Sequence, residues 1–252
     1  MKHLVYCILR SDLSMPGWNL PHGINAERVL IAAEDGLAAV YSVVPEPYAA
    51  PNVSRATAYA GVIKAFHEMQ TVLPMRYGCF FENPAQIVEL LQRRSRQFKA
   101  SLEELDGCVE VGVRALLGDD GEDMLKNLPH EAGPLSAKAY MACRAAYYAE
   151  KDCSLRHAAK AAENMRRAFD GLFVKHEVQR SFTTGARKLL SAFFLVRKEQ
   201  LQSFHNAFHQ FQKRSSVKML LTGPWPPYNF VPPPDATAGI MEPPPYLLEG
   251  PP

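Results

Sequence analysis

SVKMLLTGPWPPYNFV, residues 216–231, is the stretch to which the rest of the chain leads. Its first part, Val217–Leu221, is a short apolar run bounded by breakers, which predicts a buried strand that stops at Gly223. Three prolines follow, and each lacks an N–H for a sheet and holds its backbone near the polyproline II conformation. We therefore expect the chain to leave the sheet as a stiff, extended arm, Gly223–Phe230. Its prolines are Pro224, Pro226 and Pro227, and its aromatic residues are Trp225, Tyr228 and Phe230.

The aromatic residues of this arm bury a large apolar area, and a rigid backbone orders them at little extra entropic cost. The arm is therefore expected either to clamp back onto its own domain or to hold a partner protein. An exposed tryptophan beside tyrosine and phenylalanine promotes aggregation, which favours the clamp.

The run TGPWPPYNF also resembles the closing motif of the gas vesicle accessory proteins of the GvpL/GvpF family. A second block, Val72–Leu91 (VLPMRYGCFFENPAQIVELL), is similar to the family in its apolar strand, its proline, an arginine two residues before a glycine, and a following helix. Weaker similarities are the VEVGVRA run from Val109 and the Gly-Pro-x-x-x-x-Tyr pattern at Gly133–Tyr140. The resemblance covers most of residues 1–231, and two blocks in the right order are more specific than either block alone.

Proteins of this family are accessory factors in the formation of gas vesicles, the gas-filled protein shells that give aquatic microbes buoyancy. The resemblance implies a non-catalytic protein, without a cofactor or metal, that binds the hydrophobic shell subunit and other accessory proteins during assembly. It leaves open whether the chain is of the F or the L type. The residues that it marks as partner-binding or structural candidates are Arg76, Gly78, Gly223, Pro224, Trp225, Pro226, Pro227, Tyr228 and Phe230.

Arg76 lies between apolar residues at a bend in an expected strand, which suggests a buried or interface ion pair, because a guanidinium is rarely left unpaired in such a place. In the structural interpretation Arg76 pins strand to helix and Gly78 supplies a bend or bulge. In the functional interpretation both residues contact a partner.

The composition indicates a globular protein of one large domain or two ordinary ones, with 47% hydrophobic and 21% charged residues in a chain of 252. The formal net charge of +2 argues against a nucleic-acid binder that relies on bulk electrostatics. Five scattered cysteines without a Cys-x-x-Cys motif argue against a disulfide framework and favour a reducing compartment. No window approaches the roughly 18 apolar residues of a membrane helix, so we expect a cytoplasmic protein with no membrane partner.

The first part of the chain, residues 1–106, is predicted to be an N-terminal α/β domain with a small mixed sheet and two helices. Leu4–Leu9 is its first strand, and Asp-Gly between the apolar runs Val29–Ala33 and Leu37–Val44 predicts a hairpin. One helix is expected from a cap at Ser54 to about Gln70, and the other follows Asn83-Pro84 with a single apolar stripe that reaches Leu105.

Residues 107–231 are predicted to be a ferredoxin-like β-α-β-β-α-β domain in an α+β protein, with a first crossover enlarged to two helices, about 135–150 and 154–173. Val109, Val111 and Val113 alternate with other residues, which predicts a strand with one wet face. Strands are expected at 174–182 and 188–196, with a turn at 183–186 between them. The proline-rich tail, residues 232–252, is expected to be disordered on its own.

No motif for a phosphate-binding loop, a dinucleotide fold or a nucleophile elbow is found. His205 and His209 stand one helical turn apart but have no third metal ligand in sequence, and the acidic run Asp119–Asp123 lacks the order of a calcium loop. Both are more simply interpreted as surface residues, and so is the cluster Arg93, Arg94 and Arg96.

Two other classes of function remain open at this point. A ferredoxin-like small-molecule-binding or catalytic protein requires a deep pocket with convergent polar groups. A nucleic-acid adaptor requires strongly salt-dependent binding, and the valines of the strand at 109–113 stand where an RNA-recognition sheet would carry aromatic residues.

Overall fold

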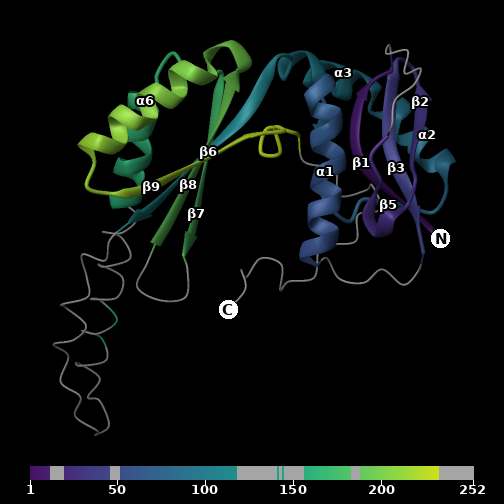
Figure 1. Cartoon of the computed structure of the whole chain (residues 1–252), viewed down its shortest axis with the longest axis horizontal. Coiled ribbons are helices and arrows are strands. Elements are labelled where there is room, and N and C mark those ends of the chain that lie inside the picture. The colour runs from purple at the N-terminus through teal and green to yellow at the C-terminus, as the bar shows by residue number, and fades with distance from the viewer. Residues whose placement is uncertain are drawn as a thin grey trace, which may run out of the picture. The chain divides into compact units, whose positions relative to one another are not determined.

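The computed structural model describes residues 1–11, 20–45, 52–117, 141, 144, 156–182 and 188–232. The chain divides into two compact units, the first made of Met1–Val109 together with the chain from Trp225, and the second of Glu110–Pro224. Figure 1 shows the elements of each unit. The predicted boundary near residue 106 and the predicted place of the arm in the second domain stay predictions.

The sheet of the first unit is built around β1, in the order β2-β3-β1-β4, with β5 also paired to β1. Each of these pairings is antiparallel, so the prediction of a mixed sheet is wrong. The chain does cross over between β3 and β4, but these two strands lie on opposite sides of β1 and are not neighbours. The strands are β1 (Lys2–Arg10), β2 (Val29–Glu34), β3 (Leu37–Val44), β4 (Leu73–Pro74) and β5 (Phe80–Phe81).

The predicted hairpin is confirmed as β2 and β3, joined at Asp35 and Gly36, whose φ angles of 48° and 74° are those of a type I′ turn. The turn is held by a later helix, because the Asp35 carboxylate accepts hydrogen bonds from the Ser95 hydroxyl and from Lys99 Nζ, the latter at 3.0 Å. These hydrogen bonds lower the pKa of Asp35. A local turn signal in the sequence is thus reinforced by a contact across 60 residues of chain.

Among the described residues of the first unit are three α-helices, α1 (Val53–Met69), α2 (Pro84–Arg93) and α3 (Ser95–Glu104), where the sequence predicted two. Asn83 caps α2 as predicted, with its side chain accepting from Gln86 N at 3.1 Å. The cap of α1 is Asn52 rather than Ser54, because the Asn52 side chain accepts from Arg55 N at 2.8 Å.

The predicted single helix after Pro84 is broken at Arg94, whose φ and ψ of −110° and 14° are not helical. The break lets α2 contact β2 and β3 while α3 contacts β1 and β4, so the two helices follow a twisted sheet that one straight helix would leave. Arg94 is buried, with its guanidinium carbon 5.1 Å from the centre of the Phe98 ring and its Nε donating to Gln97. The surface interpretation of Arg94 is therefore wrong, whereas Arg93 and Arg96 are exposed.

The core of the first unit has two layers, because α1 lies on one side of the sheet and α2 on the other (Figure 1). Side chains 4–9 of β1 are all fully buried as a result. A β-bulge shifts the register of β1 on β3 between Val5 and Cys7, so that Tyr6 and Cys7 both join the cluster under α1. The bulge breaks the alternation of faces that sequence patterns rely on.

The second unit has a four-stranded sheet in the order β7-β8-β6-β9. Its strands are β6 (Cys108–Leu117), β7 (Lys175–Phe182), β8 (Lys188–Arg197) and β9 (Lys218–Trp225). Residues 156–168 are helical and α6 spans Leu201–Arg214, so the described residues keep the predicted order of elements. The helix predicted at 135–150, the acidic run and the turn at 183–186 lie wholly or almost wholly outside the described residues.

Aromatic rings form the core of this unit, with the Phe169 ring 5.3 Å from Phe194 and 4.7 Å from Phe204 between ring centres. The predicted wet face of β6 is wrong at Glu110, which is only 2% exposed, and at Gly112, whereas Arg114 on the same face is exposed as predicted. β6 is the central strand between β8 and β9, where neighbours on both sides shield its side chains. Alternation in sequence predicted the strand but not its position in the sheet.

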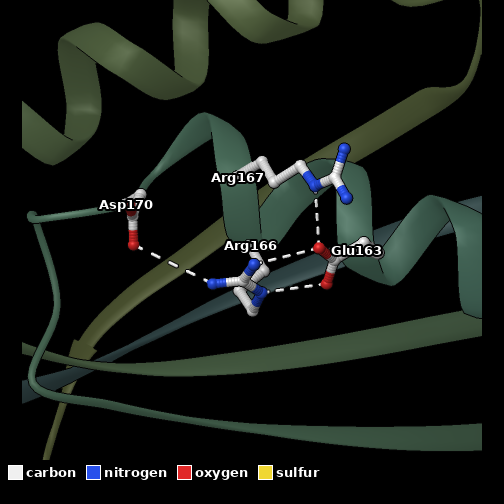
Figure 2. A network of polar contacts seen from close by, with 4 residues as sticks. All are labelled: Glu163, Arg166, Arg167 and Asp170. Atoms are coloured by element: carbon white, nitrogen blue, oxygen red, sulfur yellow. Dashed lines mark hydrogen bonds and ion pairs between the residues drawn. The ribbon is translucent and has the colours of Figure 1, made fainter.

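A network of charged side chains lies along the C-terminal part of the helix at residues 156–168 (Figure 2). Arg166 donates two hydrogen bonds of 2.9 Å to the Glu163 carboxylate, and Arg167 donates one of 2.8 Å. Asp170 pairs with Arg166 at 3.9 Å. The hydrogen bonds from Arg166 and then Arg167 lower the pKa of Glu163 from 4.5 to about 2.

Replacing Arg166 is therefore expected to raise the pKa of Glu163 toward 4.5, as measured by NMR titration of the carboxyl carbon in the variant Arg166→Gln. The stabilising contribution of this pair is present above pH 4.5 and is lost as the pH falls toward 2, because the folded pKa is the lower one. Its size is small, since the network is exposed and screened. Lys160→Gln on the same helix is the control, and an equal shift in both variants would contradict the assignment.

Candidate functional site

The block Val72–Leu91 contacts Tyr59, a residue of α1 that is 5% exposed. Its hydroxyl lies 2.9 Å from the carbonyl oxygens of Val5 and Met75. The first carbonyl belongs to β1 and the second to the segment just before Arg76. Tyr59 thus ties α1 both to β1 and to the residue that follows β4, the strand paired with β1 at the end of the sheet.

Two further aromatic rings pack against the Tyr59 ring. The Tyr59 ring centre lies 5.0 Å from that of Tyr6 and 5.1 Å from that of Tyr77. Burial raises the pKa of Tyr59 well above 10, and the nearby thiols of Cys79 and Cys7 and then the phenol of Tyr228 raise it further. The arm residue Tyr228 therefore lies in the electrostatic neighbourhood of Tyr59.

Arg76 and Gly78 belong to a tight turn that the Cys79 N–H closes on the Arg76 carbonyl at 3.3 Å. Gly78 is the third residue of this turn, and its φ of 101° is that of a type II turn, where glycine is preferred. The side chain of Arg76 is exposed, and no ion pair joins it to another described residue. The expectation of a buried ion pair at Arg76 is thus wrong, and the alternative of an ion pair at an interface stays a prediction.

The arm differs from the predicted extended strip. Strand β9 continues through Gly223, which has a φ of 110°, and Pro224 to Trp225, so the predicted stop at Gly223 is wrong. The chain then turns, with Tyr228 N–H donating to the Pro226 carbonyl at 2.8 Å and Phe230 N–H to that of Pro227 at 3.2 Å. Proline restricts its own φ and removes a donor, but its carbonyl still accepts, which allows these turns.

Within the arm, prolines and aromatic residues differ in their exposure to solvent. Pro226 and Pro227 are buried, and Phe230 is half-buried. Trp225 remains 46% exposed and Tyr228 39% exposed. Pro226 and Pro227 therefore anchor the arm, while the aromatic side chains of Trp225 and Tyr228 stay exposed to solvent.

The sequence did not single out Tyr59 or Tyr6 as members of this site. Tyr59 appeared only as one apolar position of an amphipathic helix, and Tyr6 as one position of a buried strand. Their hydroxyl groups are the signal that was available, because a buried phenol needs a hydrogen-bond partner. Tyr6 meets this need by accepting from Ile24 N at 3.0 Å.

The remaining candidates do not assemble into a reactive site among the described residues. His205 and His209 lie on α6, and no group of three metal-ligating side chains forms in the described ranges. The thiols of Cys7, Cys79 and Cys108 are buried, and burial raises the pKa of Cys79 to about 11, which makes it a poor nucleophile. None of the helices in the described ranges has the length and apolar character required to cross a bilayer.

Comparison with known proteins relates this fold and these motifs to one family. Gas vesicle protein F of Streptomyces sp. (strain CB03234) is 28% identical over 242 residues, which cover 92% of this chain and 100% of that protein. Gas vesicle protein L of the same strain is 26% identical and covers 88% of this chain and 87% of its own length. The crystal structure of gas vesicle protein GvpF from Microcystis aeruginosa has the same fold, with a TM-score of 0.70 and 18% identity over 92% of this chain and 99% of that one.

The family model of the gas vesicle synthesis proteins GvpL/GvpF matches residues 2–232, which include both sequence blocks and end just after the arm. The chain belongs to the gas vesicle synthesis protein GvpL/GvpF family.

Proposed function

We propose that this protein is a non-catalytic accessory factor of gas vesicle assembly that binds the hydrophobic shell subunit, and with it other accessory proteins, while the vesicle forms. It acts in the cytoplasm, on vesicles or on their assembly intermediates. Buried thiols are in keeping with a reducing compartment. Family membership supports the process, and the chemistry of the arm supports the binding role.

The observation that carries the proposal is the exposure of Trp225 and Tyr228 on a fastened arm. A shell subunit with an apolar surface aggregates unless it is covered, and large aromatic side chains are the usual anchors of protein interfaces. An arm that is already ordered loses little conformational entropy when it binds. We include the exposed Arg76, with Gly78 of the same turn, as further candidates for partner contact.

We infer further that the second unit is a ferredoxin-like domain. The strand order β7-β8-β6-β9 supports this, because a β-α-β-β-α-β unit places its first and third strands at the centre and its second and fourth at the edges. The enlarged first crossover lies mostly outside the described residues. The domain then serves as a scaffold from which β9 leads into the arm.

The arm is tested by replacing both exposed aromatic residues, Trp225→Ala with Tyr228→Ala, and measuring co-purification of the co-expressed shell subunit. Loss of at least tenfold in captured subunit is expected, since two anchor residues are removed. The control is Val53→Ala with Met69→Ala, which removes two exposed apolar side chains of α1. Capture that survives the arm variant, with the fold intact by circular dichroism, assigns the arm to packing alone.

A further inference from the structure

The sheet of the second unit has two edge strands, β7 and β9, and they are protected unequally. An edge strand presents unpaired backbone N–H and C=O groups, and proteins commonly blunt it with charged side chains. β7 carries exposed Lys175 and Glu177. β9 has exposed Leu220 in its middle, at 60% exposure, and is blunted only at its ends by Lys218 and Pro224.

The backbone of β9 already shows one group satisfied by a side chain. Gln212 Nε2 of α6 donates to the Met219 carbonyl at 3.0 Å. On the other side of the strand, the Thr222 hydroxyl donates to the Gly112 carbonyl of β6 at 3.3 Å, which marks the paired edge. Beyond Met219, the groups toward Gly223 form a short backbone edge with no neighbouring strand in the described part of the chain.

Positive charge gathers at the start of this edge. Lys213 and Arg214 end α6, Lys218 begins β9, and all three side chains are exposed. None of the three forms an ion pair with another described residue. A basic cluster beside an apolar edge is complementary to an extended segment that is apolar and has an acidic end.

We propose that β9 is a docking edge, on which an extended apolar segment with an acidic end pairs as an additional strand. Its backbone hydrogen-bonds to Leu221 and Gly223, which alternate with residues paired to β6, an apolar side chain covers Leu220, and its acidic end meets the cluster of Lys213, Arg214 and Lys218. The inference rests on the proposed function, in that we place this segment in the gas vesicle shell subunit. It adds a contact that is separate from the aromatic arm.

Hydrogen–deuterium exchange of the full chain, alone and with co-purified shell subunit, tests the pairing directly. Slower exchange of the outward-facing amides of Leu221 and Gly223 in the complex is expected, with β7 amides unchanged. Leu220→Lys should weaken capture of the shell subunit about tenfold, since an apolar contact is replaced by a charge. Val53→Lys makes the same change at an aliphatic residue that is 85% exposed and should have no effect.

The outcomes separate this inference from the proposed function. Capture without slower exchange in β9, or equal capture by Leu220→Lys and Val53→Lys, overturns the docking edge and leaves the accessory role standing. Failure of the unaltered chain to capture the shell subunit overturns both. Slow exchange of β9 in the protein alone, with dimers in analytical ultracentrifugation that Leu220→Lys abolishes, assigns the edge to a second copy of this chain and overturns the proposed occupant.

Discussion

Tyr59→Ala is expected to lower the free energy of unfolding by about 3–5 kcal/mol, the range for removing a large buried aromatic side chain. The substitution empties a site between the rings of Tyr6 and Tyr77 and also removes the hydroxyl group that serves the carbonyls of Val5 and Met75. Chemical denaturation with urea measures the loss. Because Tyr59 neighbours the arm, faster hydrogen exchange at Tyr228 and Phe230 is expected below the unfolding midpoint.

Tyr59→Phe separates the hydroxyl from the ring and is expected to cost about 1–3 kcal/mol, since buried carbonyl groups lose their donor. Tyr77→Phe is the matched control, because the Tyr77 ring is only half-buried and its hydroxyl has no hydrogen bond to a described residue. That control should change stability by less than about 0.5 kcal/mol. Equal stability of Tyr59→Phe and the unaltered protein would show that the hydroxyl does not hold the junction together.

Gly23→Ala is expected to destabilise the first unit by about 3 kcal/mol, at the upper end of the range for overpacking. A Cβ atom at Gly23 would overlap the Tyr6 hydroxyl and lie 2.5 Å from Ser42 Oγ. The φ of −74° at Gly23 suits any residue, so the cost is steric and not conformational. The overlap also displaces the Tyr6 hydroxyl from Ile24 N, which anchors the loop before β2.

Gly61→Ala is the control for this prediction, because no atom lies within 4 Å of a Cβ at Gly61 in the middle of α1. It should stabilise the protein by about 0.5–1 kcal/mol, since alanine is the better helix former. In the background Tyr6→Phe, which removes the overlapping oxygen, Gly23→Ala should cost less than it does in the unaltered chain. Additive effects of the two substitutions would contradict the proposed clash.

Local signals in the sequence predicted those elements that local chemistry determines. Asp35-Gly36 between two apolar runs predicted the β2–β3 hairpin, because only residues that tolerate positive φ fit its turn. Asn83 before a proline predicted the start of α2 for a similar reason. The order of elements in the second unit followed from their periodicities.

Features that depend on neighbours distant in sequence were not predictable in this way. α2 ends at Arg94 because the helix follows the twist of the sheet that it covers. The same break places the Arg94 guanidinium over the ring of Phe98. The burial of Glu110 depends on β6 being central, which strand order decides. The arm prolines restricted single residues but left the direction of the chain to contacts elsewhere.

The sequence by itself determined the family, the hairpin, the cap of α2 and the two motif blocks, because these depend on residue identity and short spacing. Only the tertiary structure decided that Tyr59 brings the turn at Arg76–Cys79 and the arm residue Tyr228 into one neighbourhood, and that Trp225 and Tyr228 stay exposed while Pro226 and Pro227 are buried. The physical reason is that burial and hydrogen-bond partners are set by segments far apart in the chain, such as α1 and β1, whose packing no local pattern encodes.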